Sequence, residues 1–250
     1  MIQFSKSEYK PGYSYIDMHF HTKYSDGTAS IKQVLKKLKE LSIGVAITDH
    51  NEIQGCTELY ERSKDLIIPG IEVKSREMVD ILFYFYNIDD LRIFFNREIL
   101  PHKKKLLYLS KTNIPLTKLL DLSKKYKCLA SVAHPFGYLF RTTFRNIFRK
   151  YEKTLSQFDV FEAINGGNFR AHNQEAIDYI YQNNKGYTAG SDGHSIQTLG
   201  RILTFSKSDS VKSFLNNIKN KKNSVAGVEV KMGKLGMYLN YTISKFKNGT

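Results

Sequence analysis

The hydrophobic positions of this chain fall into two alternating patterns. Short apolar runs such as Gly44–Thr48 and Cys128–Ala133 are typical of strands that are buried on both faces of a parallel sheet. Between such runs, apolar residues recur at helical spacing, as in Ser30–Leu41, where lysines occupy the opposite face. This alternation of strands and helices predicts a parallel sheet with helices on its outside.

The same patterns predict the boundaries of the individual elements. The predicted strands are 16–20, 44–48, 66–68, 79–86, 128–133, 159–164, 187–189 and 201–205. The predicted helices are 30–41, 53–63, 117–126, 141–155, 170–182 and 208–219, and 88–107 is expected to be helical in part, with a break at Pro101. Two further strands, 225–230 and 237–243, are expected near the C-terminus.

Side chains suited to metal binding stand at the ends of the predicted strands. His19 and His21 are two residues apart, so they project from the same face of the first strand. His50 follows the second strand and Glu72 follows the third. In parallel barrels, reactive groups gather at the carboxyl ends of the strands. An isolated H-x-H pair is more often without a role, but ligand-type residues at three successive strand ends favour a shared metal site.

The pattern continues into the second half of the chain. His134 follows the strand 128–133, and Asp192 and His194 follow the strand 187–189. In order, the motifs are D-x-H-x-H-T-x-x-S-D-G, T-D-H, G-I-E, A-H-P and G-S-D-x-H. Together they resemble the PHP superfamily, the polymerase and histidinol phosphatase type of metal-dependent phosphoesterases. The resemblance spans residues 17–194 and implies an α/β fold, a distorted (β/α)7 barrel, here with a short basic C-terminal extension.

The resemblance also implies a site for two or three divalent metal ions. One ion would be held by His19, His21, Glu72 and Asp192; a second would share Glu72 and take His134; a third would take Asp26, His50 and His194. Imidazole donors suit zinc, manganese or iron, and carboxylates suit harder ions, so the mixed set leaves the identity of the metal open.

Asp80 departs from the family pattern. Many members carry a histidine on this strand as a ligand of the second ion, and this chain has Asp80 instead. An aspartate can also bind a metal, as a harder and charged donor. The alternative interpretation is an ordinary polar residue on a strand face, and the sequence leaves both open.

A metal centre of this kind suits the hydrolysis of phosphate esters. Two neighbouring ions lower the pKa of a bound water and hold both the attacking and the leaving oxygen. The sequence shows no serine or cysteine nucleophile motif. We therefore expect metal-bound hydroxide to hydrolyse a phosphomonoester, such as a nucleotide or a histidinol-phosphate-like compound, with Asp192 and His194 as candidates for proton relay. The alternatives are exonuclease-type trimming of nucleic-acid ends and a non-catalytic PHP module that binds metal and nucleic acid.

The charge of the chain favours anionic partners. It has 38 basic and 24 acidic residues, a formal net charge of +14. Arg141 and Arg145 lie one helical turn apart after His134, so they are candidates for binding substrate phosphates, although a solvent-facing role is the alternative. Residues 206–250 hold nine lysines and two acidic residues, which indicates either a nucleic-acid surface or a lysine-rich soluble edge.

Length and composition predict the organisation of the chain. With 250 residues and 41% hydrophobic residues, we expect a barrel over residues 1–205 and a helix with strands packed on it over 206–250. The sequence has no apolar run of membrane-spanning length and no apolar signal core near its start, so we expect a cytoplasmic protein without a membrane partner.

Overall fold

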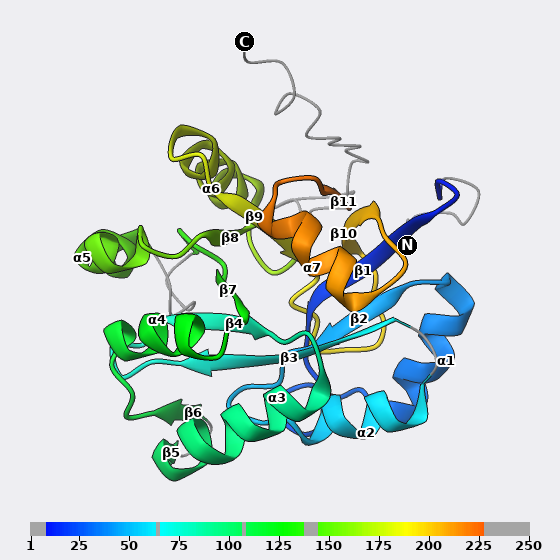
Figure 1. Cartoon of the computed structure of the whole chain (residues 1–250), viewed down its shortest axis with the longest axis horizontal. Helices are drawn as coiled ribbons and strands as arrows, with labels where there is room; N and C mark the ends of the chain where they lie inside the picture. The colour runs from blue at the N-terminus through cyan, green and yellow to red at the C-terminus, as the bar shows by residue number, and fades with distance from the viewer. Residues whose placement is uncertain (1–8, 64–65, 107–108, 138–144, 228–250) are drawn as a thin grey trace.

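A nine-stranded sheet forms the centre of the protein (Figure 1). The computed structural model describes residues 9–63, 66–106, 109–137 and 145–227. The strands of the sheet follow the order β11-β10-β1-β2-β3-β4-β7-β8-β9. Their bounds are β1 Tyr13–Phe20, β2 Gly44–Ile47, β3 Ile67–Lys74, β4 Asp80–Tyr84, β7 Leu129–Val132, β8 Val160–Asn165, β9 Gly186–Gly190, β10 Ile202–Lys207 and β11 Ser224–Gly227.

Helices cover the outside of this sheet, as Figure 1 shows. Their bounds are α1 Ile31–Leu41, α2 Gln54–Arg62, α3 Ile88–Phe94, α4 Leu116–Lys125, α5 Arg145–Leu155, α6 Arg170–Gln182 and α7 Val211–Lys219. Helix α1 begins where the sequence predicts because Ser30 and Gln33 form a reciprocal capping box. Apolar faces of α1 to α6 pack on the outer face of the sheet in one large core cluster.

A second apolar cluster fills the inside of the sheet and shows that the sheet curls around a core. Ile16, Ala46, Leu82 and Val160 come from strands that are distant in the sequence, and they pack with Phe214 of α7. Helix α7, which Figure 1 shows in front of the strands, contributes three fully buried residues to this cluster: Phe214, Leu215 and Ile218. The barrel is therefore packed with side chains and closed at one end by a helix.

Contacts between the two halves of the sheet nearly close it into a barrel. The backbone N–H of Ser191, just after β9, donates to Asp17 Oδ1 of β1 at 2.8 Å, and the N–H of Asp192 donates to the carbonyl of His19 at 2.7 Å. A side chain at Gly190 would overlap the backbone of His19, so this close approach requires glycine. The predicted α/β barrel is confirmed.

The sheet is mixed, so the prediction of a purely parallel sheet is wrong for two strands. Strand β4 runs antiparallel to β3 and to β7, and β10 runs antiparallel to β1. Because of this reversal, the first residue of β4, Asp80, lies at the same rim as the carboxyl end of β3. Register places Asp80 directly opposite Lys74.

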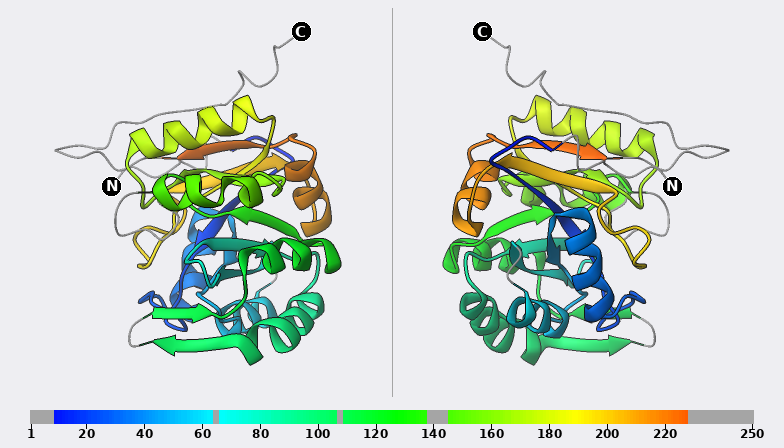
Figure 2. Two further views of the ribbon diagram at one scale, coloured as in Figure 1. Left: turned by 90° about the vertical axis from the view of Figure 1, so that its left-hand side faces the viewer. Right: turned by 90° about the vertical axis from the view of Figure 1, so that its right-hand side faces the viewer.

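The segment after α3 differs most from the sequence-based prediction. Helix α3 continues into a π-helical turn, Phe95–Ile99, and a 3-10 turn, Leu100–His102, which contains Pro101. The chain then forms a hairpin of β5 Lys103–Leu106 and β6 Leu109–Thr112. Figure 2 shows this hairpin extending sideways from the body of the barrel. Its lysines gave no alternating apolar pattern, so the strands were not predicted.

The described part of the C-terminal region packs on the same sheet. Strand β11 pairs with β10, and α7 packs against β9 and β10. The predicted domain boundary after residue 205 lies within β10. The predicted strand 237–243 and part of 225–230 lie outside the described residues. Within the described ranges, no helix has the length and apolar character needed to cross a membrane.

Candidate metal centre

Two histidines from the end of β1 form the middle of the site. His19 and His21 are fully buried, and their Nε2 atoms lie 3.1 Å apart. The pairing of β1 with β2 shifts register between Asp17 and Phe20, the stretch of β1 that contains His19. Asp192 completes this group, since its Oδ1 lies 3.5 Å from His19 Nε2 and 3.3 Å from His21 Nε2.

Glu72 of β3 connects every part of the site. Its Oε2 lies 3.4 Å from the Nε2 atoms of both His19 and His21 and 3.0 Å from His50 Nδ1. Its other oxygen, Oε1, lies 3.2 Å from His134 Nε2. A fully buried carboxylate surrounded by imidazoles is the arrangement expected of a bridging metal ligand.

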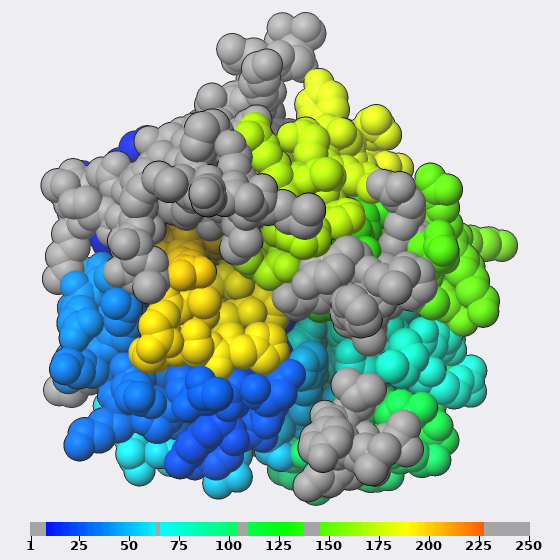
Figure 3. Space-filling view, turned by 180° about the vertical axis from the view of Figure 1, so that it is seen from behind, coloured from blue at the N-terminus to red at the C-terminus, as the bar shows by residue number. Residues whose placement is uncertain are grey.

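Three side chains form the solvent-facing part, which we call the open wall: Asp26, His50 and His194. Asp26 Oδ2 lies 3.5 Å from His50 Nε2 and 3.1 Å from His194 Nε2. Their side chains are 46%, 20% and 38% exposed, respectively, whereas the other candidate ligands are buried. In Figure 3 the loop after β9, in yellow, packs against the segment after β1, in blue, which agrees with the hydrogen bond from the N–H of Thr28 to the carbonyl of His194.

The opposite side of the site, which we call the buried wall, consists of Glu72, Lys74, Asp80 and His134. Lys74 Nζ lies 2.8 and 2.9 Å from the two carboxylate oxygens of Asp80. Asp80 Oδ2 in turn lies 3.8 Å from His134 Nε2. The sequence does not indicate Lys74 as a site residue, because its contact with Asp80 depends on the antiparallel register of β3 and β4.

Two site residues have an unusual backbone conformation. His134 has φ = 30° and Asp192 has φ = 48°, a region that residues other than glycine seldom adopt. Such conformations persist where the surrounding structure holds them, and they gather at functional sites. Both residues directly follow or lie close to a strand end of the site.

Glu162 of β8 is a buried carboxylate that sequence reasoning missed. Its Oε1 lies 3.0 Å from His19 Nδ1, and its Oε2 accepts hydrogen bonds from the N–H of His134 and from Asn165 Nδ2. This contact leaves His19 Nε2 to face the other ligands. A carboxylate behind a ligating histidine fixes the ring and its tautomer. Its signal in the sequence was a charged residue within an otherwise apolar strand.

Two further aspartates hold the loops of the site. Asp17 accepts hydrogen bonds from the N–H groups of His19, Ser191 and Gly200, and so joins β1 to the loop that carries Asp192 and His194. Asp49 accepts from the N–H and hydroxyl of Thr22 and from the hydroxyl of Ser25. These bonds fix the turn that places Asp26.

The charges of the site favour a bound cation. Burial lowers the pKa of His19 and of His50, but nearby carboxylates outweigh it: Glu162 and Glu72 raise the pKa of His19 to about 10, and Glu72 and Asp26 raise that of His50 to about 10. Burial and the neighbouring His50 hold the pKa of His21 well below its usual value. The pKa of Glu72 is lowered despite its burial, because His50 and His19 face it. Without a metal, the carboxylates thus retain protons on two imidazoles.

The donor set fits metal ions. Among the described residues, three groups offer ligand atoms that lie within 4.8 Å of one another: His21, Asp26, His50 and His194; His19, His21 and Glu72; and His50, Glu72 and Asp80. Buried atoms of this set, His21 Nδ1 and Glu72 Oε2, lack a well-aligned hydrogen-bond partner in the protein. Imidazole and carboxylate donors in this mixture suit divalent transition metals.

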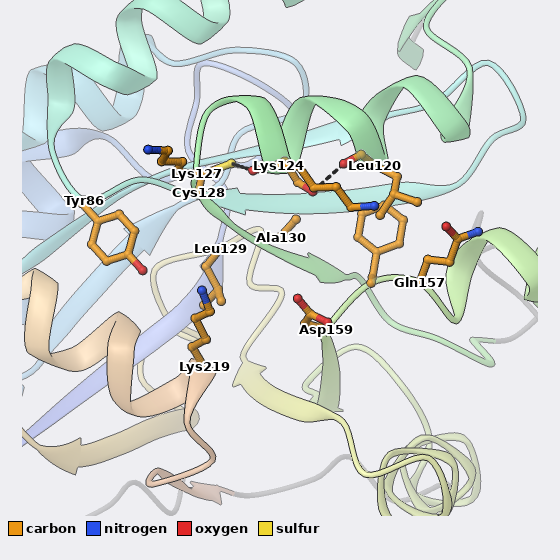
Figure 4. Close-up of a pocket in the computed structure, with 12 residues that line it drawn as sticks. Tyr86, Leu120, Lys124, Lys127, Cys128, Leu129, Ala130, Gln157, Asp159 and Lys219 are labelled. Carbon is orange, nitrogen blue, oxygen red and sulfur yellow. Dashed lines mark hydrogen bonds between the residues drawn. The ribbon is translucent and has the colours of Figure 1, made fainter.

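The structure does not place the two arginines that the sequence suggests for phosphate binding. Arg141 lies outside the described residues, and Arg145 is the first residue of α5, with its side chain outside the description. A separate pocket of about 300 Å³ lies at the amino ends of β7 and β8, opposite the rim that carries His134 (Figure 4). It is lined by Lys124, Lys127, Asp159 and Lys219 among others, and contains none of the candidate ligands.

Comparison with known proteins assigns the family. The model of the PHP domain matches residues 17–192, most of the chain, and the model named PHP-associated matches residues 170–223. The chain belongs to the PHP family. The family predicted from the motifs is therefore confirmed. A search of curated proteins found no match.

Solved structures share the fold of this PHP chain at low sequence identity. The lesion-specific endonuclease PfuEndoQ from Pyrococcus furiosus aligns with a TM-score of 0.67 and 18% identity, over 89% of this chain and 60% of that chain. A two-domain protein from Bacteroides vulgatus with a PHP-like metal-dependent phosphoesterase aligns with a TM-score of 0.63 and 17% identity, over 87% and 66%. The chain thus spans about two thirds or less of the length of these neighbours, and the likeness supports the PHP-type barrel.

Proposed function

We propose that this chain is a metal-dependent hydrolase of phosphate esters. The observation that carries the proposal is the convergence of nine candidate ligands from strand ends that are spread over the chain. They are His19, His21, Asp26, His50, Glu72, Asp80, His134, Asp192 and His194. Membership in the PHP family and a structural neighbour described as a PHP-like metal-dependent phosphoesterase support the same reaction.

The proposed ligands divide into a middle group and two walls. His19, His21, Glu72 and Asp192 would hold one ion, and the open wall would hold another. When bound, such ions supply a low-pKa water as nucleophile and neutralise the charge on the phosphate oxygens. Zinc, manganese and iron are compatible with these donors.

The chain itself would manage protons through His194. Both of its ring nitrogens face oxygen acceptors: Nε2 lies 3.1 Å from Asp26 Oδ2, and Nδ1 lies 3.0 Å from the carbonyl of Asp192. This arrangement holds the ring at the mouth of the site. Donation of a proton to a leaving oxygen is the alternative to its role as a ligand of the open wall, because the same Nε2 atom cannot serve both. Asp192 lies on the same loop, and its carboxylate faces His19 and His21 in the middle group. We therefore consider Asp192 a weaker candidate for proton relay than His194.

The exposure of the candidate ligands favours a terminal phosphate, and we therefore propose a phosphomonoester as substrate. Only the open wall has substantial exposure, while Glu72, Asp80 and His134 are buried. A phosphate at the end of a molecule can reach buried groups through such an opening more readily than one with ester bonds on two sides.

Trimming of nucleic-acid ends is the second candidate, and the β5–β6 hairpin favours it. Asn51, next to His50, donates through Nδ2 to the carbonyl and the hydroxyl of Ser110, which fixes the hairpin beside the site. Lys104 and Lys111 are directly opposite each other in register, an unfavourable pair without an anion between them. One structural neighbour is endonuclease Q in complex with a 27-mer duplex that has an abasic lesion at the active site.

A comparison of substrates tests both candidates. We would measure hydrolysis of p-nitrophenyl phosphate, a mononucleotide and a 5′-phosphorylated single strand across a salt series. If the small substrate is the natural one, its rate changes little with salt. If the single strand is the natural substrate, its affinity falls steeply with salt. The double variant Lys104→Gln with Lys111→Gln then reduces the log–log salt slope by about 1 to 2.

The matched control is Lys32→Gln with Lys39→Gln, which neutralises two exposed lysines of α1. If none of these phosphate esters is hydrolysed in the presence of metal, the proposed function is contradicted.

A further inference from the structure

The ion pair between Lys74 and Asp80 stands within the cluster of candidate metal ligands. Lys74 Nζ contacts both oxygens of Asp80, at 2.8 and 2.9 Å, and the two residues are only 4% and 1% exposed. They are direct cross-strand partners in the β3–β4 ladder. A lysine is seldom buried this deeply unless its charge is paired, so the pair is a fixed part of the site.

The backbone of Lys74 is held from two sides. Its N–H donates to Asn51 Oδ1 at 3.1 Å, and its carbonyl accepts from the hydroxyl of Thr112 at 2.8 Å. These bonds tie β3 to the residue that follows His50 and to the β5–β6 hairpin. The side chain therefore starts from a rigid position, which lowers the entropic cost of holding the ammonium against Asp80.

The position of the ammonium conflicts with one of the three candidate metal groups. Asp80 is the ligand that separates the group His50, Glu72 and Asp80 from the other two groups, which lack it. A cation bound there would compete with Lys74 for the same carboxylate and would stand next to a like charge in a buried place, where screening is weak. Neither of the other two groups uses Asp80, the carboxylate that Lys74 contacts.

We propose that the Lys74 ammonium takes the place of a metal ion at the buried wall, so that the centre holds two ions and one fixed organic cation. The inference rests on the proposed metal centre. Lys74 then supplies one positive charge beside Glu72 and His134 without binding or losing a metal. The two exchangeable ions belong to the middle group and to the open wall.

Metal counting tests this proposal. We would load the chelated protein with Mn²⁺ or Zn²⁺, remove excess ions, and count ions per chain by native mass spectrometry and elemental analysis. The wild type is expected to hold two. Lys74→Met removes the ammonium and leaves Asp80 as a buried ligand without its lysine, so this variant is expected to hold three ions and to gain more thermal stability from added metal than the wild type does.

Two controls separate this effect from a general disturbance. Lys74→Met with Asp80→Asn removes both charges, and its count is expected to remain two. Lys103→Met breaks a different ion pair, in which Lys103 Nζ lies 2.8 Å from Glu52 Oε2, and its count is also expected to remain two.

The outcomes distinguish this proposal from the proposed function. A wild type that holds three ions overturns the role of Lys74 and leaves the phosphoesterase proposal standing, whereas a wild type that holds none overturns both. A folded Lys74→Met variant that still holds two ions also overturns the role of Lys74. The wild-type count needs no variant, so it decides the matter even if Lys74→Met does not fold.

Discussion

The two walls of the site are built in different ways. The open wall takes its side chains from turns that follow strands, and Asp26, His50 and His194 all retain contact with solvent. The buried wall takes Glu72, Lys74 and Asp80 from two paired strands, and it includes a positive charge of its own. The buried wall thus has a cation within the protein, whereas we expect the open wall to balance its carboxylate with a bound ion. We therefore expect ligand exchange and substrate entry to take place at the open wall.

The largest expected effect comes from changing Glu72, which belongs to the middle group and the buried wall and also contacts His50 of the open wall. Glu72→Gln keeps the shape of the side chain but loses the charge that faces four histidines. Ligation and charge stabilisation by the metals are worth several kcal/mol, so we expect a loss of about a thousandfold in kcat/KM and a lower metal count. The rate of hydrolysis of p-nitrophenyl phosphate would measure the loss of activity, and elemental analysis would measure the metal count. Glu98→Gln, remote on the surface beside Lys125, is the control; near-normal rates in Glu72→Gln would show that the walls are independent.

Removing support from behind the middle group should have a smaller effect. Glu162→Gln weakens the contact to His19 Nδ1 but leaves every proposed ligand in place. Loss of such a supporting carboxylate typically costs 10- to 100-fold in metal affinity or activity, and we expect the same range here. Metal titration of the variant would measure it, with the exposed Glu152→Gln as the matched control. An unchanged affinity would mean that His19 needs no support from β8.

The next prediction separates folding from metal binding. Asp17 uses both carboxylate oxygens to accept hydrogen bonds, including one from the N–H of Gly200 to Oδ2 at 2.9 Å. Asp17→Asn replaces one acceptor by a donor that faces another donor, so we expect a loss of about 1 to 3 kcal/mol in the free energy of unfolding. Chemical denaturation of the chelated protein would measure it, and Asp121→Asn on the surface of α4 is expected to change little. Equal stabilities would show that the β1–β9 closure does not depend on Asp17.

The charges of the site also predict a dependence of metal uptake on pH. In the absence of metal the pKa values of His19 and His50 are raised to about 10, so both imidazoles are protonated at neutral pH and must lose protons to bind a metal. Metal affinity should therefore rise with pH, by about tenfold per pH unit for each proton released. Calorimetric titration in two buffers of different ionisation enthalpy counts these protons. A pH-independent affinity between pH 6 and 8 would contradict the charge balance described for the site.

Local patterns were sufficient to predict most of the fold and the positions of the candidate ligands. The strand ends at His19, His50, Glu72, His134 and Asp192 follow short apolar runs, and the structure brings their side chains together. Their binding of metal stays a prediction. Helix α6 has the predicted bounds, and α1 begins at its predicted cap.

What could not be predicted depends on contacts between distant strands. The pairing of Lys74 with Asp80 requires β4 to run antiparallel to β3. The direction of a strand cannot be predicted from a run of apolar residues. Glu162 reaches His19 over 143 positions of sequence because β8 and β1 lie across the same barrel. The β5–β6 hairpin is lysine-rich and lacks the alternation of apolar and polar residues that identifies a strand. The sequence therefore does not predict it, although it contacts Asn51 and Lys74 in the structure.

The most direct test of the account is the recovery of activity after metal removal. The protein would be chelated exhaustively, then titrated with Mn²⁺ or Zn²⁺ while hydrolysis of p-nitrophenyl phosphate is followed. We expect no hydrolysis in the chelated protein. On titration, the rate of hydrolysis is expected to reach its plateau at about two ions per chain, the number proposed for this site. Full activity after chelation, with no ion left on the protein, would contradict the claim that this site is a metal-dependent phosphoesterase.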